Sequence, residues 1–164
     1  MHKKTSLPDF LQKVENSIYT VVYAIDENGK VFSQGSGFYI DTSGIFITNY
    51  HVLDGAYKGL IRHRNGKEFY IEKVLDYNHN TDLVKFTVIT QNCSLQAAKI
   101  SKSIPKKGEN IVNIGNPLGL EQTVSTGIIS AVREDNTHGK YYKLRHPFHM
   151  GVVVLLFLIQ MEML

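Results

Sequence analysis

Residues 35 to 48 read Gly35-Ser-Gly-Phe-Tyr-Ile40, Asp41-Thr-Ser-Gly44 and Ile45-Phe-Ile-Thr48, and this segment clearly indicates β structure. Two short runs rich in β-branched and aromatic residues flank a segment of turn-forming residues. This pattern is typical of two antiparallel strands joined in a hairpin. A second hairpin is predicted from Leu60 to Ile71, because Arg64-Asn-Gly66 separates two apolar runs and Asn-Gly in that position is a strong hairpin signal.

Strand-like segments continue along the chain at intervals of about ten residues, with turn residues between them. The remaining strands are expected at residues 18–25, 83–88, 111–114, 123–125 and 127–132. This spacing favours an all-β fold, either a barrel or a sandwich. Helix is expected in two places. One is residues 8–16, where apolar residues recur at helical spacing behind Pro8, and the other is a short turn within residues 51–57.

The composition argues against several classes of protein. The chain has 164 residues, of which 43% are hydrophobic and 20% charged, and this is enough for one domain with a buried core. The net charge of +3 comes from scattered basic residues, which disfavours a nucleic-acid-binding surface. The lone cysteine, Cys93, excludes an internal disulfide and a multi-cysteine metal site, and we expect no cofactor or metal.

The same sequence bears on the expected location of the chain. No run approaches the ~18 apolar residues of a membrane-spanning helix. The first residues carry positive charge without an apolar segment behind it, so no signal peptide is expected and a cytoplasmic location is predicted. Nothing in the sequence indicates the oligomeric state.

Two residues at predicted strand ends are candidates for catalysis. His51 follows the apolar strand that ends at Thr48, and Asp82 directly precedes the strand that begins at Leu83. Taken singly, each has an ordinary structural explanation, because a histidine at a strand end is more often exposed or structural and an aspartate there most often caps a turn. His63 and His79 fall on predicted loops without partners at metal-ligand spacing, and we interpret them as solvated.

Five motifs occur in one order along the chain, and together they resemble the trypsin-like serine proteases of the HtrA (Deg) type. They are Gly35-Ser-Gly-Phe38, Ile47-Thr-Asn-Tyr-His-Val-Leu53, Thr81-Asp-Leu-Val84, Ile114-Gly-Asn-Pro-Leu-Gly119 and Val124-Ser-Thr-Gly-Ile-Ile-Ser130. The resemblance implies an antiparallel double β-barrel with the active site between the barrels. It also implies proteolysis of protein or peptide substrates, with His51 as the general base and Asp82 as the residue that orients it. Members of this family are commonly exported.

Ser36 does not match the family's nucleophile, although glycines flank it. A close approach between strands, which requires glycine, is the better explanation of Gly35-Ser-Gly37. In the family, the nucleophile lies in a Gly-x-Ser-Gly-Gly motif after the segment that matches Val132, and no serine follows Ser130 here. A serine hydroxyl activated by histidine is the attacking group of such enzymes, so the triad is incomplete and we expect no turnover. The alternative is a non-catalytic peptide-binding module that retains the histidine–aspartate pair.

The segment near Lys143 indicates a change of reading frame. When each codon is read from its third base into the next two, Met150 followed by Gly151 gives only glycine. The first two bases of each valine codon 152–154, preceded by the last base of the codon before, then permit only Ser, Gly, Arg or Cys. The shifted frame can therefore spell Gly-Ser-Gly-Gly, one residue shorter than the family's motif. The alternative to a change of reading frame is a genuine apolar C-terminal strand.

We therefore expect three parts in the chain. They are an N-terminal segment with a short helix (residues 1–16), a trypsin-like protease domain (residues 17–135) and an aberrant, frameshifted tail (residues 136–164). The first barrel of the protease domain is expected to be complete and the second incomplete. Because the second barrel cannot close, residues 124–132 are expected to present an unpaired edge.

Overall fold

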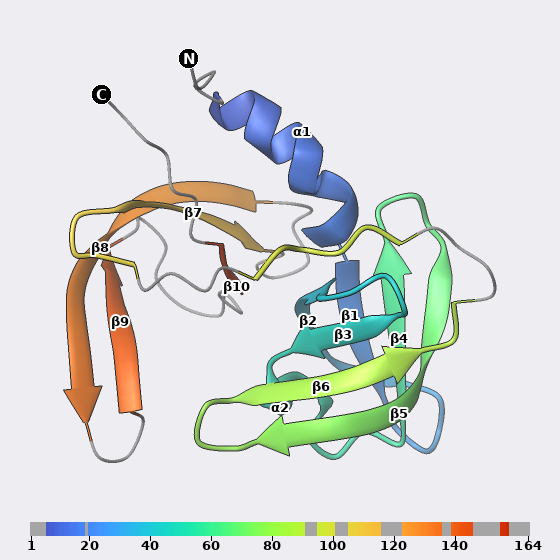
Figure 1. The fold of residues 1–164 in the computed structure, drawn as a ribbon. Helices are drawn as coiled ribbons and strands as arrows, with labels where there is room; N and C mark the ends of the chain where they lie inside the picture. The colour runs from blue at the N-terminus through green and yellow to red at the C-terminus, as the bar shows by residue number, and fades with distance from the viewer. Residues whose placement is uncertain are drawn as a thin grey trace.

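The computed structural model describes residues 6–18, 20–90, 95–100, 105–115, 123–135, 139–145 and 155–157. Within these residues, the strands form a closed six-stranded barrel and a four-stranded sheet, accompanied by two helices (Figure 1). The all-β architecture predicted from the sequence is confirmed. Cys93 lies outside the described residues.

The barrel is built from the first six strands, all paired antiparallel. They are β1 (Thr20–Ile25), β2 (Val31–Tyr39), β3 (Ile45–Thr48), β4 (Lys58–His63), β5 (Glu68–Asn78) and β6 (Leu83–Val88). Their order around the barrel is β1-β2-β3-β6-β5-β4, and β1 closes it by pairing with both β2 and β4. The first barrel is therefore complete, as expected.

Both predicted hairpins are present, and their turns use the residues that signalled them. Between β2 and β3, the Asp41 carboxylate accepts the backbone N–H of Ser43 (2.7 Å), and Gly44 has a φ of 99°. Between β4 and β5, Gly66 has a φ of 80°, a left-handed conformation that glycine adopts without steric cost.

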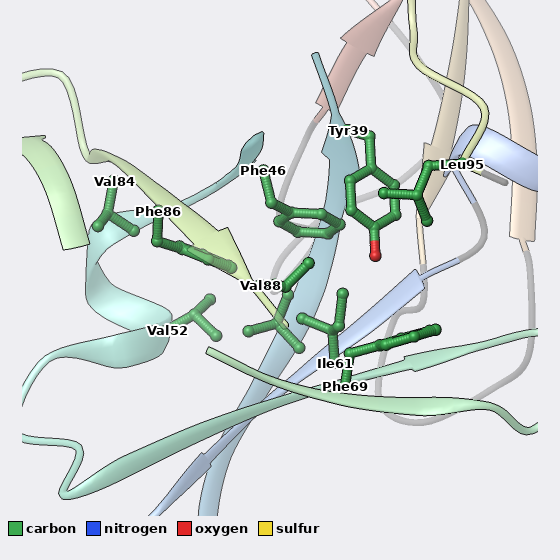
Figure 2. Close-up of a cluster of buried hydrophobic side chains, with 10 residues drawn as sticks. Tyr39, Phe46, Val52, Ile61, Phe69, Val84, Phe86, Val88 and Leu95 are labelled. Atoms are coloured by element: carbon green, nitrogen blue, oxygen red, sulfur yellow. The ribbon is translucent and has the colours of Figure 1, made fainter. Parts of the chain in front are cut away.

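Alternate residues of the barrel strands point inward and form one core. Figure 2 shows Phe46 between Tyr39 and Phe86, with ring centroids 4.9 Å and 5.2 Å away, respectively. The buried members of the cluster are Val22, Tyr39, Phe46, Val52, Ile61, Phe69, Val84, Phe86, Val88 and Leu95. A β-carbon on Gly37 would overlap Phe46 Cε1 and lie 2.6 Å from the carbonyl oxygen of Ile47. The glycine next to Ser36 is therefore needed for a close approach between strands.

The remaining strands form a separate sheet. They are β7 (Asn110–Gly115), β8 (Thr123–Asp135), β9 (Gly139–Arg145) and β10 (Leu155–Phe157), in the order β10-β7-β8-β9. The expected unpaired edge at residues 124–132 is wrong, because β8 pairs with β7 on one side and β9 on the other. Residues 139–145, which the sequence placed in the aberrant tail, supply this second partner. Among the described strands, β9 and β10 form the edges of the sheet.

Helix α1 (Leu7–Ile18) begins at a serine cap and packs on the second sheet. Ser6 Oγ accepts the backbone N–H of Asp9 (3.3 Å) and donates to its carboxylate (2.7 Å). The apolar side chains Leu7, Phe10 and Leu11, together with Val124, pack against a buried cluster formed by Val112 and Ile114. The helix ends two residues later than expected, so β1 begins only at Thr20. Within the described part of the chain, neither helix has the length and apolar character needed to cross a membrane.

Candidate active site

The pairing of β3 with β6 brings the two candidate catalytic residues together. In the register of this pair, Thr48 at the end of β3 lies opposite Val84 near the start of β6. The residues that follow Thr48 form helix α2 (Tyr50–Leu53), which carries His51, and Asp82 immediately precedes β6. Because the strands are antiparallel, the exit of one and the entry of the other lie at the same rim of the barrel.

The Asp82 carboxylate contacts both the ring and the backbone of His51. His51 Nδ1 lies 2.6 Å from Asp82 Oδ2, and the backbone N–H of His51 donates to Asp82 Oδ1 (2.8 Å). The side chains of His51 and Asp82 are 62% and 39% exposed, respectively. With Nδ1 held against the carboxylate, Nε2 is the ring nitrogen that remains to take up a proton.

The surroundings of Asp82 favour its charged form. Burial acts to raise the pKa of this carboxyl, but hydrogen bonds from the His51 backbone, the His51 ring and Asn49 together outweigh it. The pKa of Asp82 therefore lies below its usual value, and the carboxylate is ionised at neutral pH. An ionised carboxylate against Nδ1 fixes the imidazole tautomer and stabilises the cation formed when Nε2 is protonated.

The backbone of Asp82 adopts a conformation that few residues take. Its φ is 53°, and it is the one non-glycine residue with positive φ in the described ranges. Its carbonyl oxygen accepts hydrogen bonds from the backbone N–H of Tyr50 (3.1 Å) and from Asn49 Nδ2 (3.1 Å). Asn49 also donates to Asp82 Oδ2 (3.0 Å). Asn49 is a site residue that the sequence reasoning missed, although its position two residues before His51 at the start of a helical turn was a usable signal.

Aromatic rings gather around Tyr50, the residue before His51. The ring of Tyr50 lies 3.9 Å from that of His79 and 5.4 Å from that of Tyr77, measured between centroids. The hydroxyl of Tyr50 donates to the Asp54 carboxylate (3.0 Å), which raises the pKa of Tyr50. His79 is exposed, as expected, but it packs against both tyrosines.

The interpretation of His63 as a solvated loop residue is wrong. His63 ends β4 and is partly buried, with its ring against Tyr39 and Phe69, and its Nε2 lies 2.9 Å from the buried Tyr39 hydroxyl. Burial of the ring, with a smaller effect of Lys67, holds the pKa of His63 below its usual value. The physical reason is strand alternation, since residues two apart point the same way and Ile61 points into the core.

The other candidate positions contribute no catalytic group in the described structure. Ser36 is buried in β2, and its carbonyl oxygen accepts a hydrogen bond from the Thr48 hydroxyl (2.7 Å). Among the described residues, no three His, Cys, Asp or Glu side chains gather as they would around a metal ion. The stretch 146–154, where the shifted frame would encode a Gly-Ser-Gly-Gly segment, lies outside the described residues.

A closed antiparallel barrel with a histidine–aspartate pair at its rim defines a trypsin-like peptidase. Residues 35–151 match the family model described as a trypsin-like peptidase domain, which covers more than half of the chain. The chain therefore belongs to the trypsin-like peptidase family, and its relatives place it in the HtrA (Deg) type.

Two relatives support this assignment, and a solved structure shares the fold. The chain is 39% identical over 104 residues to "Putative serine protease HhoA" of Synechocystis sp., covering 63% of this chain and 26% of that protein. It is 33% identical over 105 residues to "Probable periplasmic serine endoprotease DegP-like" of Marinomonas sp., covering 64% of this chain and 22% of that protein. The crystal structure of Deg5 has the same fold, with a TM-score of 0.72 at 24% identity, covering 92% of this chain and 78% of that one. The chain spans about a quarter of the length of these curated relatives.

Proposed function

We propose that this chain carries the base and carboxylate of a serine endopeptidase site, with His51 as the general base and Asp82 as the residue that orients it. The observation that carries the proposal is the 2.6 Å contact between His51 Nδ1 and Asp82 Oδ2. An imidazole held in this way presents Nε2 to the proton of an attacking hydroxyl. Protein or peptide chains are the proposed substrates, and the exposed rings of Tyr77 and His79, which pack on Tyr50 next to the base in sequence, offer them an aromatic surface.

We further propose that this chain does not hydrolyse peptides by itself. Hydrolysis needs a nucleophile and backbone N–H groups for the oxyanion, and no serine follows Ser130 in the sequence. In this proposal, residues 1–16 precede a protease domain at residues 17–135, and the reading frame changes near Lys143 within residues 136–164. Strand β9 (Gly139–Arg145), at the edge of the second sheet, then spans the point of the frame change.

A fluorophosphonate probe tests both proposals, because it bonds to an activated serine Oγ with loss of fluoride. The chain of this sequence should remain unlabelled. A version with the reading frame restored from codon 143 should label, and His51→Ala in that version should abolish labelling. Labelling of the original chain would contradict its inactivity, and a folded, frame-restored chain that never labels would contradict the endopeptidase assignment. Sequencing the locus must find the out-of-frame Gly-Ser-Gly-Gly segment, and its absence would refute the frame change.

A non-catalytic peptide-binding module is the second candidate. The observation that favours it is the coexistence of an ordered histidine–aspartate pair with a sequence that lacks the nucleophile. It predicts that unlabelled, folded chain still binds unstructured peptides, which would appear as chemical-shift changes at the exposed Tyr77 and at His79.

A further inference from the structure

Asn49 occupies the N-cap position of α2 but does not cap that helix. An asparagine at this position ordinarily accepts an N–H of its own first turn, and the Asn49 side chain makes no such bond. The first two N–H groups of the helix are instead satisfied by Asp82, whose carbonyl oxygen accepts from Tyr50 (3.1 Å) and whose Oδ1 accepts from His51 (2.8 Å). Asp82 therefore caps the helix in place of Asn49, and the Asn49 amide can form hydrogen bonds elsewhere.

The Asn49 amide bridges the backbone carbonyl and the side-chain carboxylate of Asp82. Its Nδ2 lies 3.1 Å from the backbone carbonyl oxygen of Asp82 and 3.0 Å from Oδ2 of the same residue. One planar NH₂ group bonded to both atoms fixes the carboxylate relative to its own backbone. Oδ2 is also the oxygen that faces His51 Nδ1. The bridge thus determines where the acceptor for the imidazole lies.

The exposure of the pair shows why such a bridge matters. His51 is 62% exposed, so its own packing does little to hold the ring in place. Asp82 is held in the left-handed region at φ 53°, which is tolerated only where its surroundings enforce it. Asn49 supports this backbone through the carbonyl and the carboxylate orientation through Oδ2.

We infer that Asn49 is a positioning residue, whose amide sets the Asp82 carboxylate against His51 Nδ1 within the first barrel alone. Its catalytic meaning rests on the proposed function. The geometry it sets is measurable whether or not the chain turns over substrate.

The tautomer of the His51 ring reports this geometry directly. In the full chain at mildly alkaline pH, long-range ¹H–¹⁵N spectra of the imidazole give the ratio of the Nδ1–H to the Nε2–H form, and the Nδ1–H form should dominate. Losing the Asn49 donor in Asn49→Ala should lower that ratio roughly three- to tenfold, as expected for the net contribution of one ordinary hydrogen bond at a partly exposed site. The isosteric Asn49→Asp places a carboxylate oxygen against Oδ2 and should lower it further.

A matched control separates positioning from stability. Asn65 Oδ1 accepts the backbone N–H of Lys67 (3.0 Å) in the turn between β4 and β5, so Asn65→Ala also removes a side-chain hydrogen bond, but away from His51. It should leave the tautomer ratio unchanged. Asn49→Ser, which keeps a hydroxyl donor and a good cap, should retain an intermediate ratio.

Each outcome decides the inference. An unchanged ratio in folded Asn49→Ala, or an equal drop in Asn65→Ala, would overturn it. Unfolding of both Asn49→Ala and Asn49→Ser would also overturn it, because the residue would then be needed for the fold and not for the pair. Failure of the probe experiment on frame-restored chain would contradict the proposed function and leave the tautomer result intact.

Discussion

Replacing Gly37 by alanine tests whether the core of the first barrel is rigid where β2 crosses Phe46. The new β-carbon would overlap Phe46 Cε1 and lie 2.6 Å from the Ile47 carbonyl oxygen. Phe46 is fully buried between Tyr39 and Phe86, and the Ile47 oxygen belongs to the backbone of β3. Neither the Phe46 ring nor the Ile47 carbonyl can therefore move aside easily.

The magnitude follows from this geometry. Overpacking a core costs about 1–3 kcal/mol, and the upper end applies where the neighbours cannot move. Alanine in place of glycine returns about 0.4–1 kcal/mol by restricting the unfolded chain. We therefore expect Gly37→Ala to lower the free energy of unfolding by about 2 kcal/mol, out of a total of about 5–15 kcal/mol for an ordinary domain.

Gly59→Ala is the matched control in a neighbouring part of the same barrel. Its β-carbon would overlap Cδ1, the free end of the flexible, partly buried Ile71 side chain, and lie 2.9 Å from Cγ1 of the same side chain. Because that end can rotate away, we expect a change within about 1 kcal/mol of zero. Gly37→Ala combined with Phe46→Ala should cost less than the sum of the two single changes, since removing the ring removes one obstacle.

Urea unfolding followed by far-UV circular dichroism or tyrosine fluorescence measures these changes, because the chain has nine tyrosines and no tryptophan. Equal destabilisation by Gly37→Ala and Gly59→Ala would show that β2 accommodates a side chain at residue 37. Strict additivity with Phe46→Ala would show that the ring is not the obstacle. Either result would refute the reasoning.

Three further changes probe other parts of the molecule. Burial lowers the pKa of His63, so the unfolded chain binds more protons below the ordinary value of 6.5. Stability should be intact above that pH and decline as pH falls through the folded-state pKa, and His63→Gln should flatten this decline between about pH 7.5 and about pH 5 in urea titrations. The Arg62–Glu68 ion pair is short (2.6 Å), but its side chains are 48% and 41% exposed, so Glu68→Gln should change stability by less than about 1 kcal/mol, and a larger loss would contradict its surface character. Ser6→Ala removes the cap of α1 and should cost about 1 kcal/mol in thermal or urea unfolding, whereas Ser6→Thr should cost little.

Local signals in the sequence were sufficient for the hairpins of the first barrel. The Asn-Gly at residues 65–66 and the Ser-Gly at residues 43–44 lie in turns whose glycines have positive φ. Such signals depend on residues adjacent in sequence, and backbone sterics alone make them informative. The same reasoning placed β3 and β6 to within a residue.

The meeting of His51 and Asp82 could not be obtained in this way. The residues are 31 positions apart, and they meet because β3 pairs with β6, across the intervening β4 and β5. No local pattern encodes that non-consecutive pairing, so the expectation came from the family resemblance. Asn49 was missed for a related reason, since its partner is distant in sequence.

Two misplaced expectations could have been avoided with the information in the sequence. His63 lies two residues after the inward-facing Ile61 on the same strand, and strict alternation predicts that it points toward the core. Strand β9 was missed because the whole segment after residue 135 was assigned to an aberrant tail. Its Gly139–Arg145 stretch contains Tyr141 and Tyr142, which favour strands, and it pairs with β8.

The left-handed backbone of Asp82 has a consequence for how such a site decays over evolutionary time. Asparagine tolerates this conformation about as well as aspartate, and its amide oxygen can still accept the His51 backbone N–H. Aspartate and asparagine codons differ by one base. A lineage released from selection for peptide cleavage therefore has a single-step exchange at residue 82 that removes the charge and keeps the loop. Among duplicated copies of this barrel, loss of the carboxylate is expected to precede loss of the fold.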